Sequence, residues 1–530
     1  MSNKFKLLLA IAGVIVFWSF ATPIFEFPDE QAHVESVEFL VKNNRMPFGK
    51  EWDMTEETMR TQTFLGNFRD NYGNNKYTYH PEYHVEYTDT LIGKYEAEII
   101  ALRSPSNRDH YVAKEAARYP RLYYDFVGLF YRALQDQDII LRTYVMRLGN
   151  VVLSIATIYF IYQIGLLIFT KKSFALILAA MATFQPMFSF LSAGVNSDNL
   201  HILLYTIFIY YCLRFIISGW AKINLFIFTL VIIADFYTKP QAYVMAPILF
   251  LAFILRWLVY KTFKVKWKKV LALGILVLIG ILPKEGQTLL ALVWRGRVPY
   301  SYSPKIASTP PNFLEFVKFS INKFYAQNMV WYWGLFKWLG IVLPRIWWWI
   351  ANRLALLSGI GLLIGIFRTF RQTKGMKANL PIIFLAGACA IYMFAIFWFD
   401  WQYAKGVGYS IGVQARYYFP VISTQLSIML YGLLAYSWNK NSQIMISRIV
   451  LLFFVALQIA GMYTLLSSYY DLTSISSFIT QASQYKPAFA KGDWWYLWGG
   501  LYIVSIIYLT FLGMVGIKAK KKSFLDRRKL

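Results

Sequence analysis

Long apolar runs alternate with polar segments along most of the 530-residue chain. A helix needs about 20 mainly apolar residues to cross the hydrocarbon core of a bilayer, and most of these runs are close to that length. The pattern therefore predicts an all-α polytopic membrane protein with about twelve transmembrane helices. We place these helices at 7–25, 144–170, 173–193, 200–218, 222–237, 242–260, 270–283, 346–367, 379–399, 418–438, 449–469 and 495–516.

The longest polar interruption, residues 26–141, follows the first apolar run and predicts a large extracytoplasmic loop with juxtamembrane helices. Within it, residues 29–42 carry apolar side chains at helical spacing on one face, with Glu35 and Glu38 on the other. This spacing indicates an amphipathic helix that lies along the membrane surface. Asp29 suits the start of that helix, where a carboxylate accepts hydrogen bonds from free backbone N–H groups.

A second polar region, residues 284–345, is rich in Trp and Pro and interrupts the apolar runs again. It divides the chain into three parts. We expect a transmembrane module over 1–283 that includes the loop 26–141, then the outer loop 284–345. A C-terminal transmembrane module with a basic cytoplasmic tail follows over 346–530.

Composition and charge support a membrane protein. The chain is 57% hydrophobic and 15% charged, whereas an average soluble domain is roughly a quarter charged. The net charge of +26 would suit a nucleic-acid partner, but the basic residues cluster in short loops and in the tail. That distribution follows the positive-inside rule, so we predict no nucleic-acid partner and a multi-pass protein of the plasma membrane with both termini cytoplasmic.

The first apolar run has a second interpretation. Lys4 and Lys6 precede it, as in a secretory signal peptide. We interpret the run as an uncleaved first span because no small-residue cleavage site precedes Asp29. The two cysteines, Cys212 and Cys389, fall in apolar runs. We expect them to be buried small hydrophobic residues and not to form a disulfide.

The candidate chemistry starts where the first span ends, with the consecutive carboxylates Asp29 and Glu30. Anchors at a membrane interface are usually aromatic or basic, so two acids at a span exit suggest a functional site. The predicted topology brings further charged residues to the same face: Asp198, Lys239 and Arg416 at it, and Arg147, Asp235 and Arg353 within a turn or two. Such charges mark a site or a pathway, unless they only snorkel to the interface.

His33 lies one helical turn after Asp29. Its ring can orient the Asp29 carboxylate by a hydrogen bond, which we favour. Alternatively, Asp29, Glu30 and His33 together are candidate ligands for a divalent cation such as Mg²⁺ or Mn²⁺.

Two further features suit a lipid-linked substrate. Lys239 and Arg416 can hold a phosphate group at the bilayer surface, and Arg does so with two parallel hydrogen bonds. Trp333 belongs to a Trp-rich segment, 331–349, that can stack on a sugar or an isoprenoid chain. An interfacial aromatic belt explains that segment equally well.

Several motifs together resemble one superfamily. Residues 28–33, Pro-Asp-Glu-Gln-Ala-His, resemble the P-D-E-x-x-H signature at the exit of the first span in GT-C glycosyltransferases. They look closest to a bacterial branch whose first loop begins P-D-E-P-A-H. Segments 119–124, 196–199, 238–240, 333–338 and 414–420 resemble further motifs of that branch, in the same order. Tyr119 and Arg121 depart from its H-P-P-L-Y-Y motif, and the missing histidine puts a metal or substrate role at that position in doubt.

The resemblance implies a chemistry. GT-C enzymes use a polyprenyl-phosphate-linked sugar donor on the outer face, and a first-loop carboxylate acts as base on the acceptor while the anomeric centre inverts. Carried over, Asp29 would be the base, and Glu30 would orient the acceptor or help to hold a cation. Lys239 and Arg416 would bind the phosphate, and Asp198 would support them or bind metal. The acceptor would be a glycan, a lipid or a protein.

Other functions remain open at this stage. A polytopic transporter has a similar number of spans, although transporters tend to show two related halves around a midplane site. A lipid-linked glycan ligase or polymerase has closely related chemistry, but tends to carry its large outer loop late in the chain. A structural membrane protein without catalysis is the remaining alternative.

Overall fold

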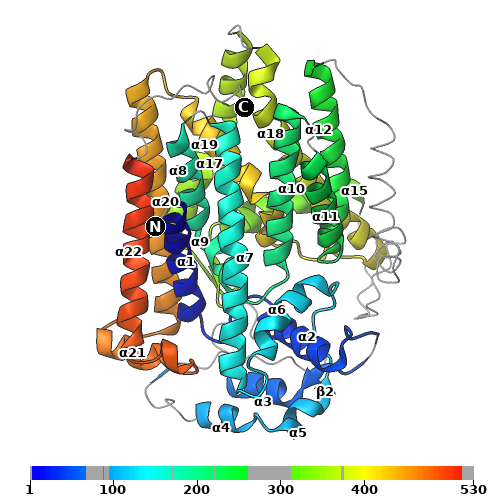
Figure 1. Ribbon diagram of the computed structural model, residues 1–530, viewed down its shortest axis with the longest axis vertical. Helices are drawn as coiled ribbons and strands as arrows, with labels where there is room; N and C mark the ends of the chain where they lie inside the picture. Colours follow the sequence, from blue (N-terminus) through cyan, green and yellow to red (C-terminus); the bar gives the residue numbers. More distant parts are fainter. Residues whose placement is uncertain are drawn as a thin grey trace.

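The computed structural model describes residues 3–49, 51–66, 87–88, 95–169, 171–219, 222–260, 312–371 and 375–515. These residues form an elongated bundle of helices that carries a cap of short elements at one end, which we call the loop end (Figure 1). The expected span at 270–283 and the basic tail beyond residue 515 lie outside the described residues.

The bundle contains helices from both halves of the chain. The N-terminal half supplies α1 (Asn3–Ala21), α7 (Ile139–Ile168), α8 (Lys172–Thr183), α9 (Pro186–Ala193), α10 (Asp198–Ser218), α11 (Lys222–Phe236), η3 (Pro240–Val244) and α12 (Met245–Tyr260). The C-terminal half supplies α17 (Arg345–Arg371), α18 (Gly375–Val407), η5 (Ala415–Val421), α19 (Ile422–Leu434), α20 (Lys440–Tyr469) and α22 (Trp494–Val515). Every described helix of the bundle coincides with an apolar run in the sequence.

The membrane-spanning character of the bundle follows from helix length and apolarity. Among the described residues, seven helices are long and apolar enough to cross a membrane, and the bent pair α8–α9 would make an eighth. Two shorter apolar helices, Phe5–Ala21 and Asn224–Phe236, fall below that length. A mostly helical architecture with several candidate membrane spans is therefore confirmed, whereas the count of about twelve spans stays a prediction.

The bend between α8 and α9, of 66°, has a local cause. Pro186 has no backbone N–H to continue a helix, and it restricts the residue before it to extended conformations. Gln185 accordingly adopts an extended backbone, and its side chain accepts a hydrogen bond from the backbone of Phe188 to start α9. The break delivers the following residues to the loop end.

The loop end is built mainly from the first polar region. It contains α2 (Glu30–Asn43), β1 (Met54–Thr55), α3 (Glu56–Phe64), α4 (Glu96–Ala101), α5 (Pro105–Asp109), β2 (Tyr111–Ala113) and α6 (Leu122–Arg132). The two strands pair antiparallel, with Met54 opposite Ala113 and Thr55 opposite Tyr111. The pairing folds the first loop back on itself below α7 (Figure 1).

The position of α2 differs from the expected one. The helix forms where the spacing predicts it, but residues 30–40 are buried on both faces. Glu35 accepts a hydrogen bond from the backbone of Thr55 at 3.0 Å, and Glu38 pairs with Arg142 of α7. A buried carboxylate needs such partners, and they come from β1 and α7, where the sequence pattern suggested water. The expectation of a helix with one face in solvent along the membrane is wrong for this reason.

The later polar segments complete the loop end. They form α15 (Phe313–Lys323), η4 (Phe324–Asn328), α16 (Met329–Trp331), the antiparallel pair β3 (Leu335–Phe336) and β4 (Ile341–Val342), α21 (Ile475–Ala482) and η6 (Ala488–Ala490). The β3–β4 hairpin lies in the Trp-rich segment and packs on the end of α1. Phe336 stacks on Trp18 with ring centroids 5.7 Å apart, and the Trp338 indole donates a hydrogen bond to the Phe25 carbonyl at 2.8 Å.

Candidate functional site

Five charged or ionisable side chains from distant parts of the sequence lie together at the loop end. We call Asp29, His33, Asp198, Lys239 and Arg416 the rim cluster. Each lies at or next to a helix end: the first two at the start of α2, the third at the start of α10, and the last two beside η3 and in η5. Their shared membrane depth predicts that Asp29, Glu30, Asp198, Lys239 and Arg416 converge. The positions of the four that belong to the rim cluster support this prediction, whereas their chemical roles are not tested by it.

Asp29 has an unusual backbone. Its φ of 60° and ψ of 17° place it in the left-handed region, which side chains other than glycine adopt infrequently. The expected capping contact is absent, because the carboxylate makes no hydrogen bond to the first turn of α2. Instead Oδ2 accepts a hydrogen bond from Arg416 Nη2 at 2.5 Å, across 387 residues of sequence. The Asp29 side chain is 38% exposed, so this carboxylate faces outward while it is paired.

Arg416 is buried beside Asp29, with only 6% of its side chain exposed. Its Nε and Nη1 atoms are buried and have no hydrogen-bond partner among the described residues. Leaving a buried donor unsatisfied costs roughly 1–3 kcal/mol, so such a group favours an acceptor that is brought to it. A guanidinium with one edge on a carboxylate and other donors free has the geometry to receive an anion.

A second ion pair lies beside the first. Lys239 Nζ is 2.5 Å from Asp198 Oδ1 and 4.4 Å from the centre of the Tyr119 ring. The backbone N–H of Asp198 donates to Asn196 Oδ1 at 2.8 Å, and the Asn196 amide donates to the Pro28 carbonyl at 3.1 Å. These bonds join the Asn-Ser-Asp-Asn segment directly to the exit of the first span.

His33 is buried between aromatic rings. Its Nδ1 shares a hydrogen bond of 2.9 Å with the Tyr124 hydroxyl, and its ring stacks on Tyr119 with centroids 6.0 Å apart. The expected hydrogen bond to Asp29 is thus replaced by one to Tyr124, which the sequence analysis did not identify. Burial lowers the pKa of His33 to about 3, although the two rim carboxylates oppose that shift. The ring is therefore uncharged at neutral pH.

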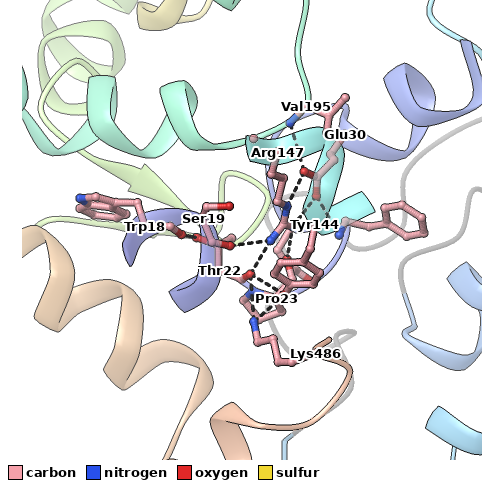
Figure 2. A network of polar contacts seen from close by, with 12 residues as sticks. Trp18, Ser19, Thr22, Pro23, Glu30, Tyr144, Arg147, Val195 and Lys486 are labelled. Carbon is pink, nitrogen blue, oxygen red and sulfur yellow. Dashed lines mark hydrogen bonds and ion pairs between the residues drawn. The ribbon is translucent and has the colours of Figure 1, made fainter. Parts of the chain in front are cut away.

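Glu30, next to Asp29, points in a different direction. Its side chain is fully buried and pairs with Arg147 of α7, which donates from Nε at 2.8 Å and from Nη2 at 2.6 Å (Figure 2). The same carboxylate accepts from the backbone N–H groups of Phe25 at 3.0 Å and Val195 at 3.2 Å. All four contacts come from the protein itself. Glu30 therefore joins three parts of the chain: the turn that connects α1 to α2, helix α7, and the segment before α10.

Arg147 also satisfies the end of the first span. It donates to the carbonyls of Ser19, Thr22 and Pro23 at 2.7–2.8 Å, groups that a helix C-terminus leaves without intrahelical partners (Figure 2). Lys486 adds a bond to the Thr22 carbonyl at 3.1 Å and one to the Tyr144 hydroxyl at 2.6 Å. The Arg147 guanidinium at this position also complements the negative end of the helix dipole.

Residues near the C-terminal end of the chain reach the same turn. The Tyr470 hydroxyl donates to the Ala21 carbonyl at 3.0 Å, and the Tyr469 hydroxyl donates to Glu26 at 2.7 Å. The sequence analysis did not identify these two tyrosines or Lys486. Nothing in the local sequence separates them from the many other aromatic and basic residues of the chain.

The proposed metal ligands do not share a site. The side chains of Asp29, Glu30 and His33 are directed to Arg416, Arg147 and Tyr124, respectively. Within the part of the chain that the structure describes, no group of three His, Cys, Asp or Glu residues is arranged to hold a metal ion. As they are arranged in the structure, Asp29, Glu30 and His33 do not fit a common cation.

Two other candidates occupy packed positions. Trp333 is 3% exposed, and its indole donates to Asn352 at 2.7 Å. Asp235 is fully buried and lies 2.7 Å from His201 Nδ1, a bond that joins α11 to α10. Its backbone carbonyl accepts from the Lys239 N–H at 2.8 Å, so it supports the chain segment that carries Lys239. Stacking of Trp333 on a sugar stays a prediction.

The convergence predicted for Asp29, Glu30, Asp198, Lys239 and Arg416 includes a cavity that these residues surround. Among the described residues, one cavity of about 320 Å³ lies between α4 and α21, and another of about 280 Å³ lies beside the C-terminal half of α2. Neither is lined by a member of the rim cluster. The charged groups converge as expected, whereas an open cavity around them stays a prediction.

The helical bundle and the buried ion pairs at one end define a polytopic membrane protein with an ionic site at its rim. More particularly, the chain belongs to the family described as "Predicted membrane protein (DUF2142)", whose model matches residues 12–424. No curated protein matches the chain.

Solved structures show a distant likeness. ArnT from Cupriavidus metallidurans, bound to undecaprenyl phosphate, is 13% identical over 96% of this chain and 76% of its own, with a TM-score of 0.41. The oligosaccharyltransferase of Archaeoglobus fulgidus, tethered with an acceptor peptide, is 12% identical over 93% of this chain and 57% of its own, with a TM-score of 0.42. This chain thus spans little more than half of the oligosaccharyltransferase.

Proposed function

We propose that the protein is a GT-C-type membrane glycosyltransferase. It would transfer a sugar from a polyprenyl-phosphate-linked donor to an acceptor hydroxyl at the extracytoplasmic face, with inversion of the anomeric centre. Support comes from the motif segments that resemble this superfamily. Segments 28–33, 196–199, 238–240 and 414–420 are far apart in sequence, and each contributes a residue to one group of contacts at the loop end.

The observation that carries the proposal is the contact between Asp29 and Arg416. A transfer from a lipid phosphate needs a carboxylate to accept a proton and a cation to hold the leaving phosphate, close enough to act on one donor. Asp29 and Arg416 are in direct contact, and Asp29 is the more exposed of the two. Arg416 retains donors without partners among the described residues, which a phosphate oxygen would accept.

In the proposed reaction the acceptor oxygen forms a bond to the anomeric carbon as the bond from that carbon to the phosphate oxygen breaks. The hydroxyl proton passes to the Asp29 carboxylate, and the electron pair leaves with the polyprenyl phosphate. Arg416 and Lys239 would stabilise the negative charge that develops on the phosphate. Engagement of Arg416 by the phosphate would also loosen its bond to Asp29 and so free the carboxylate to act as base.

The neighbouring residues have supporting roles in this proposal. Asp198 would position Lys239 through their ion pair. Glu30 would fix the turn that presents Asp29 by way of Arg147, since its burial argues against direct contact with an acceptor. The uncharged ring of His33 would pack beside the base and hold Tyr124 in place.

A transfer assay tests the proposal. Purified protein in proteoliposomes is incubated with radiolabelled polyprenyl-phosphate sugars and a mixture of envelope glycans, lipids and proteins, and the label in a new glycosidic bond is measured. We expect transfer by the wild type and a loss on the order of 10²–10⁴ in rate for Asp29→Asn, which keeps the shape but not the basicity.

Asp493→Asn is the matched control, because Asp493 is an exposed carboxylate of the loop end outside the rim cluster. It should transfer at the wild-type rate. Retention of more than about a tenth of the wild-type turnover by Asp29→Asn would remove the assignment of the base. Uptake of labelled sugar without any new bond would favour a transporter instead.

A further inference from the structure

The cavity beside the C-terminal half of α2 is separate from the rim cluster. It has a volume of about 280 Å³ and opens among side chains from five described elements and the turn after α6. Its lining includes Glu38 and Lys42 of α2, Asp109 of α5, Tyr111 of β2, Tyr131 of α6 and Gln135. Ligand pockets typically measure about 300–1,000 Å³, so this one is suited to a single small unit.

The charges around the cavity largely compensate one another. Glu38 is paired with Arg142, and Lys42 Nζ lies 2.5 Å from Asp109. The two remaining charged lining residues, Arg108 and Asp136, are of opposite sign. This balance disfavours a strongly anionic or cationic ligand. The oxygen and nitrogen atoms of such side chains can take hydrogen bonds beyond the ones they make with each other, which suits a neutral ligand rich in hydroxyl groups.

The aromatic part of the lining is held rigidly. The Tyr111 hydroxyl accepts from the Asn43 amide at 3.0 Å, and its ring packs against Phe39 with centroids 5.2 Å apart. The Tyr131 hydroxyl donates to Glu38 at 3.1 Å. Lys42 Nζ lies 5.3 Å from the centre of the Tyr111 ring, and the Arg142 guanidinium lies 5.2 Å from that of Tyr131. A wall fixed in this way is in place before a ligand binds, so little entropy is lost on binding.

From these observations we infer that the cavity is a binding subsite for one neutral sugar unit of a glycan acceptor. The inference rests on the proposed function, because the same helix carries both places. Asp29 stands at the start of α2 and Lys42 near its end, about 20 Å apart at the helical rise. A sugar unit bound in the cavity would therefore lie away from the end of the acceptor that reacts at Asp29. Binding energy from such a remote unit helps to position the reacting hydroxyl.

Direct binding tests the subsite without any need for transfer. The full-length protein in lipid nanodiscs is titrated with fluorophore-labelled neutral di- and trisaccharides built from hexose, pentose or N-acetylhexosamine units. We expect at least one probe to bind the wild type. Gln135→Trp adds bulk at an exposed lining position and should weaken binding by about tenfold or more.

One variant serves as the control. Thr480→Trp adds the same bulk at the separate cavity between α4 and α21 and should have no effect. The subsite is refuted if no probe binds the wild type above empty nanodiscs, or if Gln135→Trp binds as tightly as the wild type.

The same experiment separates this inference from the proposed function. Asp29→Asn should bind the probe normally, since Asp29 does not line the cavity. Normal transfer without probe binding would remove the subsite and leave the glycosyltransferase assignment intact. The opposite outcome is also informative. If Gln135→Trp abolishes probe binding while Asp29→Asn still transfers sugar at the wild-type rate, the subsite is supported and Asp29 is not the base.

Discussion

Asn196 and Pro28 are joined by a hydrogen bond of 3.1 Å from the side-chain amide of the first to the backbone carbonyl of the second. The bond fixes the segment before α10 against the turn that presents Asp29. Asn196 Oδ1 also accepts from the Asp198 N–H at 2.8 Å, so one buried side chain aligns both rim carboxylates. The relative positions of Asp29 and Asp198 thus depend on a residue that itself carries no charge.

This relationship predicts a selective effect of Asn196→Ala. Loss of two hydrogen bonds should lower the free energy of unfolding by about 1–3 kcal/mol and leave the protein folded. Transfer should fall by a larger factor, because both carboxylates lose their alignment. The measurement is the thermal midpoint in detergent beside the transfer rate. Equal activity of the variant and the wild type would show that the alignment is not needed.

Arg416 is predicted to act on the donor phosphate in the ground state and in the transition state alike. Arg416→Ala should therefore raise the KM for the donor. Arg416→Lys keeps the charge but not the planar fork, and should restore only part of the affinity. Steady-state kinetics over a range of donor concentrations check this. A fall in kcat with an unchanged KM would contradict a contact with the bound phosphate.

Glu30 and Arg147 are predicted to act on stability first. Breaking a buried ion pair by removal of one partner costs about 3–5 kcal/mol, so Glu30→Gln and Arg147→Met should each lower the unfolding midpoint markedly. The double variant Glu30→Gln/Arg147→Met should recover part of that loss, because it leaves no unpaired charge. A Glu30→Gln protein of wild-type stability that no longer transfers sugar would instead indicate a direct catalytic role.

The buried His33 predicts a dependence of stability on pH. The pKa of His33 is about 3 in the folded protein against 6.5 for an unperturbed histidine, because burial disfavours the charged ring. Between these values the unfolded chain binds the additional proton, so stability falls as pH falls from 6.5 towards 3. The slope for one proton is about 1.4 kcal/mol per pH unit. Denaturation of the wild type and His33→Asn from pH 7 to pH 4 should show a shallower decline for the variant; parallel curves would refute the assignment.

The orientation of the loop end in the membrane is open to a labelling test. Trp52, in the first loop, is 62% exposed, and Lys440 begins α20 at the opposite end of the bundle. A membrane-impermeant maleimide applied to intact cells should label Trp52→Cys and not Lys440→Cys. The native Cys212 is buried, which limits background labelling, and a Cys389→Ser background removes the other thiol. If only Lys440→Cys is labelled, the loop end lies on the cytoplasmic side and the predicted topology is wrong.

The apolar pattern predicted most of the fold because a bilayer imposes one simple rule on a spanning helix. Helices such as α7, α10 and α20 need only length and apolarity, and both are visible in the sequence. The same pattern misjudged α2. Its acidic face looked solvent-exposed because the partners that bury it, Thr55 and Arg142, lie 20 and 104 residues from the carboxylates they bind.

For the candidate site, the sequence predicted only that the charged residues share one depth at the membrane surface. Depth placed Asp29, Asp198, Lys239 and Arg416 at one face, but it did not determine which acid pairs with which base. Those choices depend on helix packing and on local turns such as the left-handed conformation of Asp29. Adjacent acids were therefore treated as one pair, although the structure separates an exposed carboxylate from a buried one.

The bonds from Tyr469, Tyr470 and Lys486 to the turn after α1 bear on how the protein can be re-engineered. All three residues lie beyond position 424, where the match to the family model ends. A chimera that exchanges residues 425–530 with those of a relative would remove these donors unless the incoming segment replaces them. The last fifth of the chain therefore belongs to the same structural unit as the first loop, and it is not an exchangeable module.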